Sequence, residues 1–208
     1  MSSKIIPVHI WSDIACCWCY IGETILKQAI NLFNKRHQDV KVDIIFHSYM
    51  ISHQANEGGE DFIEYNKRTW NGDQQWIQEL KEKGKKYGCN FSNWIYWPNS
   101  LLCHKLISES KKVGKCNEIV EELFISEYEH GKNISIESTL NDIAKQYGIN
   151  NWNTEENFKI AKNDDQIGKK KYGIKSVPFF LFPNDEVVDN SGDIETFLNA
   201  LEKAFDSL

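Results

Sequence analysis

The sequence runs that predict β-strands lie near the two ends of this chain, and the long segment between them has almost none. Residues 5–11 (IIPVHIW) and 40–46 (VKVDIIF) are rich in β-branched residues, and residues 176–182 (SVPFFLF) form a third such run. A polar turn, PNDE at 183–186, separates the third run from two valines and predicts a β-hairpin. At 208 residues the chain is long enough for one core, or for one fold that carries a large insertion.

Two series of apolar residues recur at helical spacing beside these runs. The first is Ile25, Leu26, Ala29, Ile30 and Phe33, and the second is Ile194, Phe197, Leu198, Leu201 and Phe205. No tight turn joins residues 5–11 to 40–46, so strand, helix and strand predict a parallel βαβ unit. From about residue 60 to 171 the pattern is helical, with Asn99 and Thr154 as expected N-caps.

The charge balance limits the partners of the chain. Its 30 acidic and 24 basic residues give a net charge of −6, which argues against nucleic acid or an anionic membrane as the main partner. No apolar run reaches the roughly 18 residues of a membrane helix, and the first residues lack the apolar core of a secretory signal. We therefore expect a protein of the reducing cytoplasm, where a C-x-x-C sequence is more often catalytic or metal-binding than structural.

The segment DIACCWCYIG at 13–22 holds three of the six cysteines. Cys16 follows the first strand, where a helix should begin, and the unpaired N–H groups and dipole of a helix start stabilise a thiolate. Cys19 lies one turn later on the same helix face and can close a disulfide with Cys16. This spacing suits thiol–disulfide exchange, with Cys16 as the nucleophile and Cys19 as the resolving thiol.

A zinc site is the main alternative for this cysteine pair, and a set of inert buried thiols is another. A structural zinc site needs four nitrogen or sulfur ligands, but the chain has no second C-x-x-C and no paired histidines. We therefore expect no metal. Cys89 and Cys116 are expected to be buried and to behave as small apolar residues.

Three motifs, in this order, resemble one known family. They are SDIACCWCYIG at 12–22, NSLLCHKLI at 99–107 and YGIKSVPFFLF at 172–182, followed by the closing amphipathic helix. Over essentially the whole chain they resemble the DsbA-like thioredoxin superfamily, and most closely its FrnE-type branch. The resemblance implies an α/β, thioredoxin-like fold with a large helical insertion.

The resemblance also implies where the domains and the substrate lie. Residues 1–52 and 172–208 would form the thioredoxin-like domain, and residues 53–171 the inserted helical domain. The Val177–Pro178 peptide bond would be cis and packed against the Cys16–Cys19 pair. The backbone beside Pro178 would then hold an extended substrate.

Cys17 departs from the family pattern, which usually has proline directly after the first cysteine. Without that proline, φ is free and a backbone N–H returns to the first helical turn. A Cys16–Cys17 bridge would be strained and therefore easily reduced. We expect Cys16–Cys19 as the oxidised pair, with Cys17 exposed or turned away.

Other residues near these motifs each have two interpretations. We expect Trp18 to shield the disulfide and contact substrate rather than only pack, and Asp13 to be a solvated loop acid rather than a modulator of the thiols. The aromatic segment 93–98 (NWIYWP) is expected to pack the inserted helices rather than line a peptide groove. His104 is expected to be a hydrogen-bonded helix residue and not the base of Cys103, because adjacent helical residues do not face each other.

These observations predict a protein disulfide oxidoreductase. Its partners would be protein or peptide thiols and disulfides, no cofactor would be required, and glutathione is a candidate redox partner. It would be a monomer or a homodimer. The enzyme alternative is a glutathione-dependent isomerase or transferase of the kappa-class or 2-hydroxychromene-2-carboxylate isomerase type, whose members typically carry serine where Cys16 stands. The other alternative is a chaperone-like binding module without catalysis.

Overall fold

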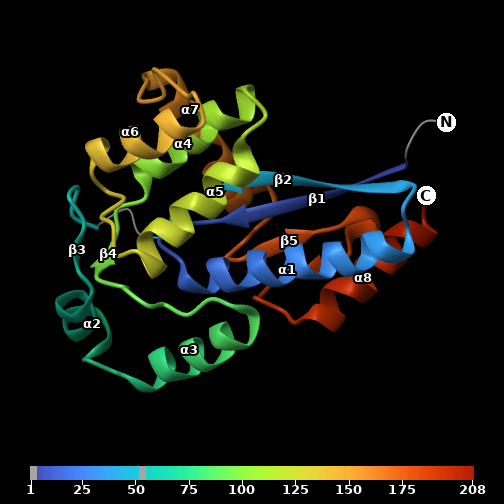
Figure 1. Cartoon of the computed structure of the whole chain (residues 1–208), viewed down its shortest axis with the longest axis horizontal. Helices are drawn as coiled ribbons and strands as arrows, with labels where there is room; N and C mark the ends of the chain where they lie inside the picture. The colour runs from blue at the N-terminus through green and yellow to red at the C-terminus, as the bar shows by residue number, and fades with distance from the viewer. Residues whose placement is uncertain (1–3, 52–54) are drawn as a thin grey trace.

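The computed structural model describes residues 4–51 and 55–208. Its main sheet contains β1 (Lys4–Ser12), β2 (Val40–Ser48), β5 (Phe179–Leu181) and β6 (Val187–Val188), in the order β2-β1-β5-β6. β1 pairs parallel to β2 along its whole length and antiparallel to β5, while β6 pairs antiparallel to β5. The predicted βαβ unit and hairpin are confirmed, and the two ends of the chain meet in one sheet (Figure 1).

Two helices, α1 (Cys17–Arg36) and α8 (Ile194–Asp206), lie side by side on one face of this sheet (Figure 1). Their predicted apolar stripes face inward, and the fully buried members are Ile25, Leu26, Ala29, Phe33, Phe197 and Leu201. The strand residues Ile6, Val8 and Ile10, also fully buried, complete this core. Full burial of a large apolar side chain stabilises a fold by about 1.5–3 kcal/mol, so α1 is packed firmly against the sheet.

The chain between β2 and β5 is mainly helical. It contains α2 (Phe62–Trp70), α3 (Gln75–Tyr87), α4 (Leu101–Lys112), α5 (Cys116–Phe124), α6 (Glu137–Gln146) and α7 (Glu155–Gln166). Single turns of π-helix, Ile125–Glu129 and Ile167–Lys171, continue α5 and α7. In Figure 1, α4, α6 and α7 lie on the opposite side of β1 and β2 from α1 and α8, while α5 crosses in front of these strands. The expected domain division stays a prediction, and its first boundary, between residues 52 and 53, lies outside the described residues.

A short second sheet in this helical block is a difference from the sequence pattern, which indicated almost no strand there. It pairs β3 (Glu60–Asp61) antiparallel with β4 (Tyr96–Trp97). Each strand has two residues, too few for an alternation of apolar and polar residues to be recognised.

Of the two predicted N-caps, the one at α7 is confirmed and the one at α4 is wrong by one residue. The Thr154 hydroxyl accepts a hydrogen bond from the Asn157 N–H and caps α7, as predicted. The N-cap of α4 is Ser100 and not Asn99, so that prediction is wrong by one position. The Asn99 side chain nevertheless accepts the Leu101 N–H at 3.1 Å, because an asparagine in a turn can bond the backbone two residues on.

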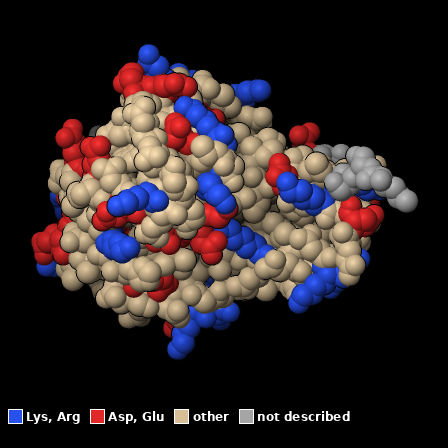
Figure 2. Space-filling view, turned by 45° about the horizontal axis from the view of Figure 1, so that its top comes forward, with Lys and Arg blue, Asp and Glu red and all other residues tan. Residues whose placement is uncertain are grey.

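Charged side chains of both signs are interspersed over the face drawn in Figure 2, with no block of one sign. Mixed surfaces of this kind give little long-range attraction for a nucleic acid. Within the part of the chain that the structure describes, no helix combines the length and the apolar character needed to cross a membrane.

Candidate active site

Cys16 lies at the junction between β1 and α1. It is the N-cap of α1, with extended backbone, and its carbonyl accepts the Cys19 N–H at 2.9 Å. The Cys16 N–H donates to the Asp13 carbonyl at 3.0 Å, which closes the turn that follows the strand. The Cys16 side chain is 7% exposed, so its sulfur lies just below the surface at the end of a helix that favours an anion.

The segment before β5 closes over Cys16. The Cys16 thiol donates to the Val177 carbonyl oxygen at 3.5 Å, and the Val177–Pro178 peptide bond is cis. Gly22 allows Pro178 to pack on α1: a Cβ at position 22 would lie 3.0 Å from Pro178 Cγ and 3.1 Å from the Phe180 ring. Only a glycine at position 22, which has no side chain, therefore lets α1 pack this closely against the segment that carries Val177.

Cys19 is fully buried one turn into α1. Burial raises the pKa of its thiol well above the ordinary value, and the neighbouring Cys16 thiol acts in the same direction. The Ser12 hydroxyl lies within hydrogen-bonding reach of Cys19 and donates a 2.6 Å hydrogen bond to Glu23 Oε1. Burial raises the pKa of Glu23 to about 7, against the opposing effects of Lys27 and Ser12. A chain of polar groups thus links Cys19 to a carboxyl that changes its protonation near neutral pH.

Glu23 also reaches a cavity of about 330 Å³. The cavity is bounded by charged and polar side chains that include Lys27, Gln28 and Glu121, with Tyr20 beside them. Water in such a cavity can exchange protons with the carboxyl, so the polar chain from Cys19 has an exit. The sequence did not identify Glu23 or Ser12 as site residues. A charged residue such as Glu23 in a predicted helix is usually interpreted as exposed to solvent.

Cys17 is buried, with 4% of its surface exposed, so of the two expectations for it, exposed or turned away, the first is wrong and the second stays a prediction. It starts α1 but joins the main apolar core, to which the inserted residue Tyr128 also belongs. Burial raises the pKa of the Cys17 thiol well above its ordinary value, and Cys16 adds to this effect. A buried, protonated thiol is a poor competitor for Cys16 as a nucleophile.

Asp13 is fully buried, so the expectation of a solvated loop acid is wrong. Its Oδ1 accepts hydrogen bonds from His104 Nε2 at 3.1 Å and from the Ala15 N–H at 3.2 Å, and its Oδ2 accepts the Ile51 N–H at 2.7 Å. Burial acts to raise the pKa of Asp13, but its bonds, led by the one from His104, outweigh burial and hold that pKa below the ordinary value. Through these hydrogen bonds Asp13 links three parts of the chain, which are the segment after β2, helix α4 and the turn around Cys16.

His104 and Tyr128 contact the turn that carries Cys16, a contact that the sequence pattern did not predict. His104 on α4 is fully buried and bonds Asp13 through one ring nitrogen, while its Nδ1 has no hydrogen-bond partner among the described residues. The expected hydrogen-bonded role thus holds for one nitrogen only. The Tyr128 hydroxyl donates to the Ile14 carbonyl at 3.0 Å. The inserted helices therefore hold the turn that presents Cys16.

An aromatic pocket of about 350 Å³ lies beside Cys16. It is lined by Cys16, Cys17, Trp18, Ile51, Trp70, Trp76 and Trp97. Trp97 is buried and stacks on Tyr65, with 4.4 Å between the ring centroids, so the segment 93–98 packs the inserted helices and also lines a pocket. Trp18 is half-buried on the pocket wall, and its contact with substrate stays a prediction.

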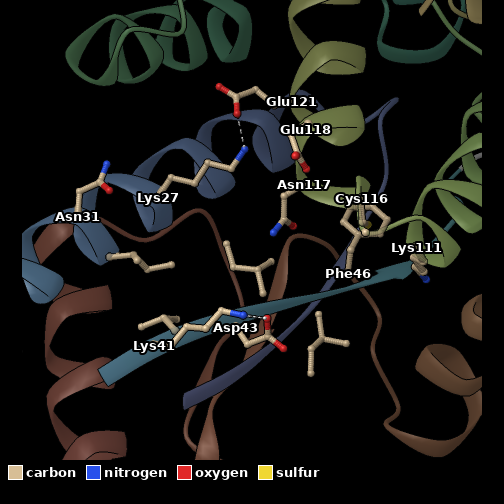
Figure 3. Close-up of a pocket in the computed structure, with 15 residues that line it drawn as sticks. Lys27, Asn31, Lys41, Asp43, Phe46, Lys111, Cys116, Asn117, Glu118 and Glu121 are labelled. Atoms are coloured by element: carbon tan, nitrogen blue, oxygen red, sulfur yellow. Dashed lines mark hydrogen bonds and ion pairs between the residues drawn. The ribbon is translucent and has the colours of Figure 1, made fainter. Parts of the chain in front are cut away.

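A larger pocket, of about 880 Å³, is lined by α1, β2 and α5 and contains none of the three clustered thiols (Figure 3). Its charged side chains are paired: Lys27 with Glu121, Lys41 with Asp43, Lys111 with Asp164 and Glu118 with Lys115. Burial raises the pKa of its cysteine, Cys116, to about 11. Paired charges and a protonated thiol offer little chemistry, so we place the candidate active site at Cys16.

Metal ligation finds no support in the geometry. Within residues 4–51 and 55–208, no three histidine, cysteine, aspartate or glutamate side chains gather as a metal ion would require. All six cysteines are free thiols in the structure.

Solved structures share this fold at low sequence identity. A probable DsbA oxidoreductase from Streptomyces coelicolor has a TM-score of 0.79 and 18% identity, over 98% of this chain and 91% of its own. The cytosolic disulfide reductase DsbM from Pseudomonas aeruginosa has a TM-score of 0.67 and 16% identity, over 97% of this chain and 100% of its own. A 2-hydroxychromene-2-carboxylate isomerase has a TM-score of 0.68 and 13% identity, over 97% of this chain and 95% of its own.

The sequence also matches a family description over nearly its full length. A search of curated proteins finds no match. The model of the DSBA-like thioredoxin domain, in contrast, matches residues 7–202, which include both cysteines of the pair and Pro178. The predicted thioredoxin-like fold with its helical insertion is thereby confirmed, while the FrnE-type branch stays a prediction. This chain belongs to the family of DSBA-like thioredoxin domains.

Proposed function

We propose that this protein is a thiol–disulfide oxidoreductase whose reactive pair is Cys16 and Cys19. The observation that carries the proposal is the position of Cys16, at the N-cap of α1 with Cys19 within hydrogen-bonding reach. A helix N-terminus favours the thiolate that attacks a disulfide, and a second thiol one turn later is suitably placed to resolve the product.

The exchange takes two steps. The Cys16 thiolate attacks one sulfur of a substrate disulfide, forms a mixed disulfide and releases the other substrate sulfur as a thiolate. Cys19 then loses its proton and attacks the Cys16 sulfur, which closes the Cys16–Cys19 disulfide and releases the second substrate sulfur. The substrate gains two electrons and the protein loses two. In the reverse direction the same steps oxidise a substrate dithiol.

Ser12 and Glu23 are proposed to carry the proton that Cys19 must lose. The Ser12 hydroxyl can take this proton while it passes its own to Glu23 across the 2.6 Å hydrogen bond. With a pKa of about 7, the Glu23 carboxyl is partly ionised at neutral pH and is therefore a suitable base there.

Trp18, Val177 and Pro178 are proposed to position the substrate, since all three border Cys16 or pack against its helix. The substrates would be protein or peptide thiols and disulfides. Glutathione is the proposed redox partner: two molecules would reduce the Cys16–Cys19 disulfide and leave as oxidised glutathione. The structure of DsbM with GSH supports this choice, and a cytosolic relative supports the reducing cytoplasm as the location. The chemistry requires no metal or organic cofactor.

One of the similar structures is an isomerase, and it supports an alternative function for this protein, that of a glutathione-dependent isomerase. The presence of both Cys16 and Cys19 favours disulfide exchange, because isomerisation of a glutathione conjugate needs no resolving thiol. Turnover of such a conjugate without any disulfide cycling would support the isomerase instead.

A Cys16→Ser variant tests the proposal directly. With glutathione as the reductant and a fluorogenic peptide disulfide as the substrate, this variant should fall to the uncatalysed rate, because no other thiol of the site is placed to replace Cys16. Cys116→Ser is the matched control, since its thiol lines the larger pocket and not the aromatic pocket beside Cys16, and this variant should keep the wild-type rate. Full exchange activity in Cys16→Ser would overturn the proposal.

A further inference from the structure

Strand β2 forms one edge of the main sheet. It pairs with β1 along nine residues, and within residues 4–51 and 55–208 no other strand pairs with it. The opposite edge is formed by β6, which has only two residues. A long edge strand presents a row of free N–H and C=O groups to which a further strand can add. β2 is therefore the place where this sheet could be extended.

The pocket of about 880 Å³ lies along this edge (Figure 3). Residues 41–46 of β2 line it, together with residues of α1 and α5. Val42 and Ile44 are only partly buried, and with Ile30 of α1 they make up the half-exposed apolar part of the lining. The two helices thus leave space beside β2 and do not cover its free side.

The two faces of β2 differ in character. Val42 stands opposite Ile6, a fully buried residue of β1, so Val42 and Ile44 share the face that α1 covers. Lys41 and Asp43 alternate with them and therefore lie on the other face, with 65% and 48% of their side chains exposed. These two charges pair with each other at 3.5 Å. Because such exposed pairs contribute little to stability, either charge can take another partner at small cost.

The order of these residues makes the edge complementary to itself. When β2 of a second copy pairs antiparallel with Val42 opposite Val42, Lys41 of each copy lies opposite Asp43 of the other. Val40 of each copy then lies opposite Ile44 of the other, on the apolar face. Two-fold symmetry forms each of these contacts twice. Opposite charges directly across two antiparallel strands stabilise the pairing.

The neighbouring registers lack this match. Centring the pairing on Asp43 places two aspartates opposite each other, and centring it on Lys41 does the same with two lysines. Like charges directly opposite each other destabilise a strand pair. The registers in between would place the apolar face of one copy beside the charged face of the other. Only the pairing about Val42 satisfies both the charges and the faces.

We propose that the free edge of β2 is the contact between two copies of this chain, paired antiparallel about Val42. The contact joins the two four-stranded sheets into one. It involves residues 40–44, which pair with residues 4–8 at the end of β1 far from Cys16. Both candidate active sites therefore stay accessible, and the proposal does not depend on the proposed function.

An extended segment of an unrelated protein is the other occupant that a free edge accepts. The self-complementary order of Lys41, Val42 and Asp43 favours the second copy, because an unrelated segment need not carry matching charges at these positions. The two possibilities differ in a measurable way: only the second copy makes the purified protein associate with itself.

Sedimentation equilibrium of the reduced protein, from low micromolar to submillimolar concentration, measures this association. A reducing agent prevents dimers linked by a disulfide. The net charge of each copy is −6, so the measurement is made at about 0.15 M salt, where repulsion is screened beyond about 8 Å. We expect a dimer with a Kd in the micromolar range, because five paired residues make a small interface.

Charge reversals locate the contact. Lys41→Asp and Asp43→Lys each place like charges in both symmetric contacts and should each weaken the dimer at least about tenfold. An equal mixture of these two variants should associate again, because one copy then presents two acids and the other two lysines. The double variant Lys41→Asp with Asp43→Lys should also recover the wild-type affinity. Recovery in the mixture excludes misfolding of either variant as the cause of its weak association.

Lys145→Asp and Asp142→Lys on α6 are the matched controls, because they make the same changes of net charge at exposed positions away from β2. Both should keep the wild-type affinity. A monomer at every concentration overturns the proposal, and so does a dimer that survives both reversals on β2. Weakening by each reversal without recovery in the mixture overturns the pairing about Val42. Weakening by each, with recovery in the mixture and in the double variant, supports it.

Discussion

His104 on α4 donates a hydrogen bond from Nε2 to Asp13 Oδ1 at 3.1 Å, and both side chains are fully buried. Asp13 stands three positions before Cys16, and its backbone carbonyl accepts the Cys16 N–H. The pair therefore connects the inserted helices to the turn that carries Cys16, the proposed nucleophile. This contact makes the helical insertion part of the candidate active site and not only a cover over it.

Replacing Asp13 by Asn should lower the free energy of unfolding at pH 7 by about 2 kcal/mol, because it removes a buried, charge-assisted hydrogen bond. The pKa of folded Asp13 lies below its ordinary value. Its contribution to stability is therefore complete above the unfolded pKa of about 3.9 and is lost as the pH falls below it. Urea unfolding at pH 7 and at pH 3 measures this. The difference between wild type and Asp13→Asn should be smaller at pH 3, whereas the exposed control Asp142→Asn should differ little at either pH.

Glu23→Gln should change the pH dependence of stability in the opposite sense. Burial raises the pKa of Glu23 to about 7, so the folded state favours the neutral carboxyl. Ionisation between the ordinary pKa and 7 therefore destabilises the wild-type protein as the pH rises, by about 3 kcal/mol from about pH 4.5 to about pH 8. The Gln variant should lack this decline. Lys27, Glu121 and Cys116 also face this region and are unchanged in the comparison.

The same Glu23→Gln variant should slow the resolving step while leaving the first attack by Cys16 largely intact. Rapid-quench measurements on a peptide disulfide separate the two steps. In the wild-type protein the resolving rate should rise with pH around a midpoint near 7, and in the variant this rise should disappear. Glu195→Gln, an exposed position on α8, is the control. An unchanged resolving step in Glu23→Gln would rule out the proton route through Ser12.

Gly22→Ala should impair both stability and exchange, although alanine is the better helix former by about 1 kcal/mol. The added Cβ would meet Pro178 Cγ at 3.0 Å and the Ser191 Cα at 3.2 Å, so α1 and the Val177–Pro178 segment must separate. We expect a loss of about 1–3 kcal/mol, as for other overpacked sites, together with a lower kcat/KM. The control is Gly58→Ala, where a Cβ has open space. Equal effects of the two substitutions would contradict the close fit.

Cys19→Ser should let Cys16 attack a substrate disulfide but leave the mixed disulfide unresolved. The intact mass of the variant, after reaction with a peptide disulfide and acid quench, should show one peptide bound covalently. The same experiment on Cys16→Ser should show none. A bound peptide on Cys17, identified by peptide mapping, would mean that the buried thiol is reactive and that the roles of the cysteines differ from those proposed.

The helices and strands that could be predicted from the sequence are those in which apolar or β-branched residues form a regular pattern along the chain. The β-branched runs became β1 and β2, and the apolar stripe after Glu23 became the buried face of α1. Cys16 and Cys19 stand together in the sequence, so they could be proposed as the reactive pair from their spacing alone. Patterns of this kind reveal residues that are neighbours along the chain.

The rest of the site depends on contacts between distant residues. Asp13 and His104 are 91 positions apart, and nothing local distinguishes a buried aspartate in a turn from a solvated one. Trp70 and Trp76 belong to helices whose packing direction the sequence pattern did not define, so the pocket wall they form could not be predicted. The burial of Cys17 could not be predicted either, because the inserted helices that cover it contribute no signal near residue 17.

The most direct test of the proposed mechanism is to find which cysteines form the disulfide. The wild-type protein is equilibrated with a series of ratios of reduced to oxidised glutathione, quenched by alkylation and mapped by peptide mass spectrometry. We expect Cys16 and Cys19 to become oxidised together, in one bridge, while Cys17 is alkylated only after unfolding. A bridge that involves Cys17, or a Cys16 that stays reduced at every ratio, would contradict the mechanism.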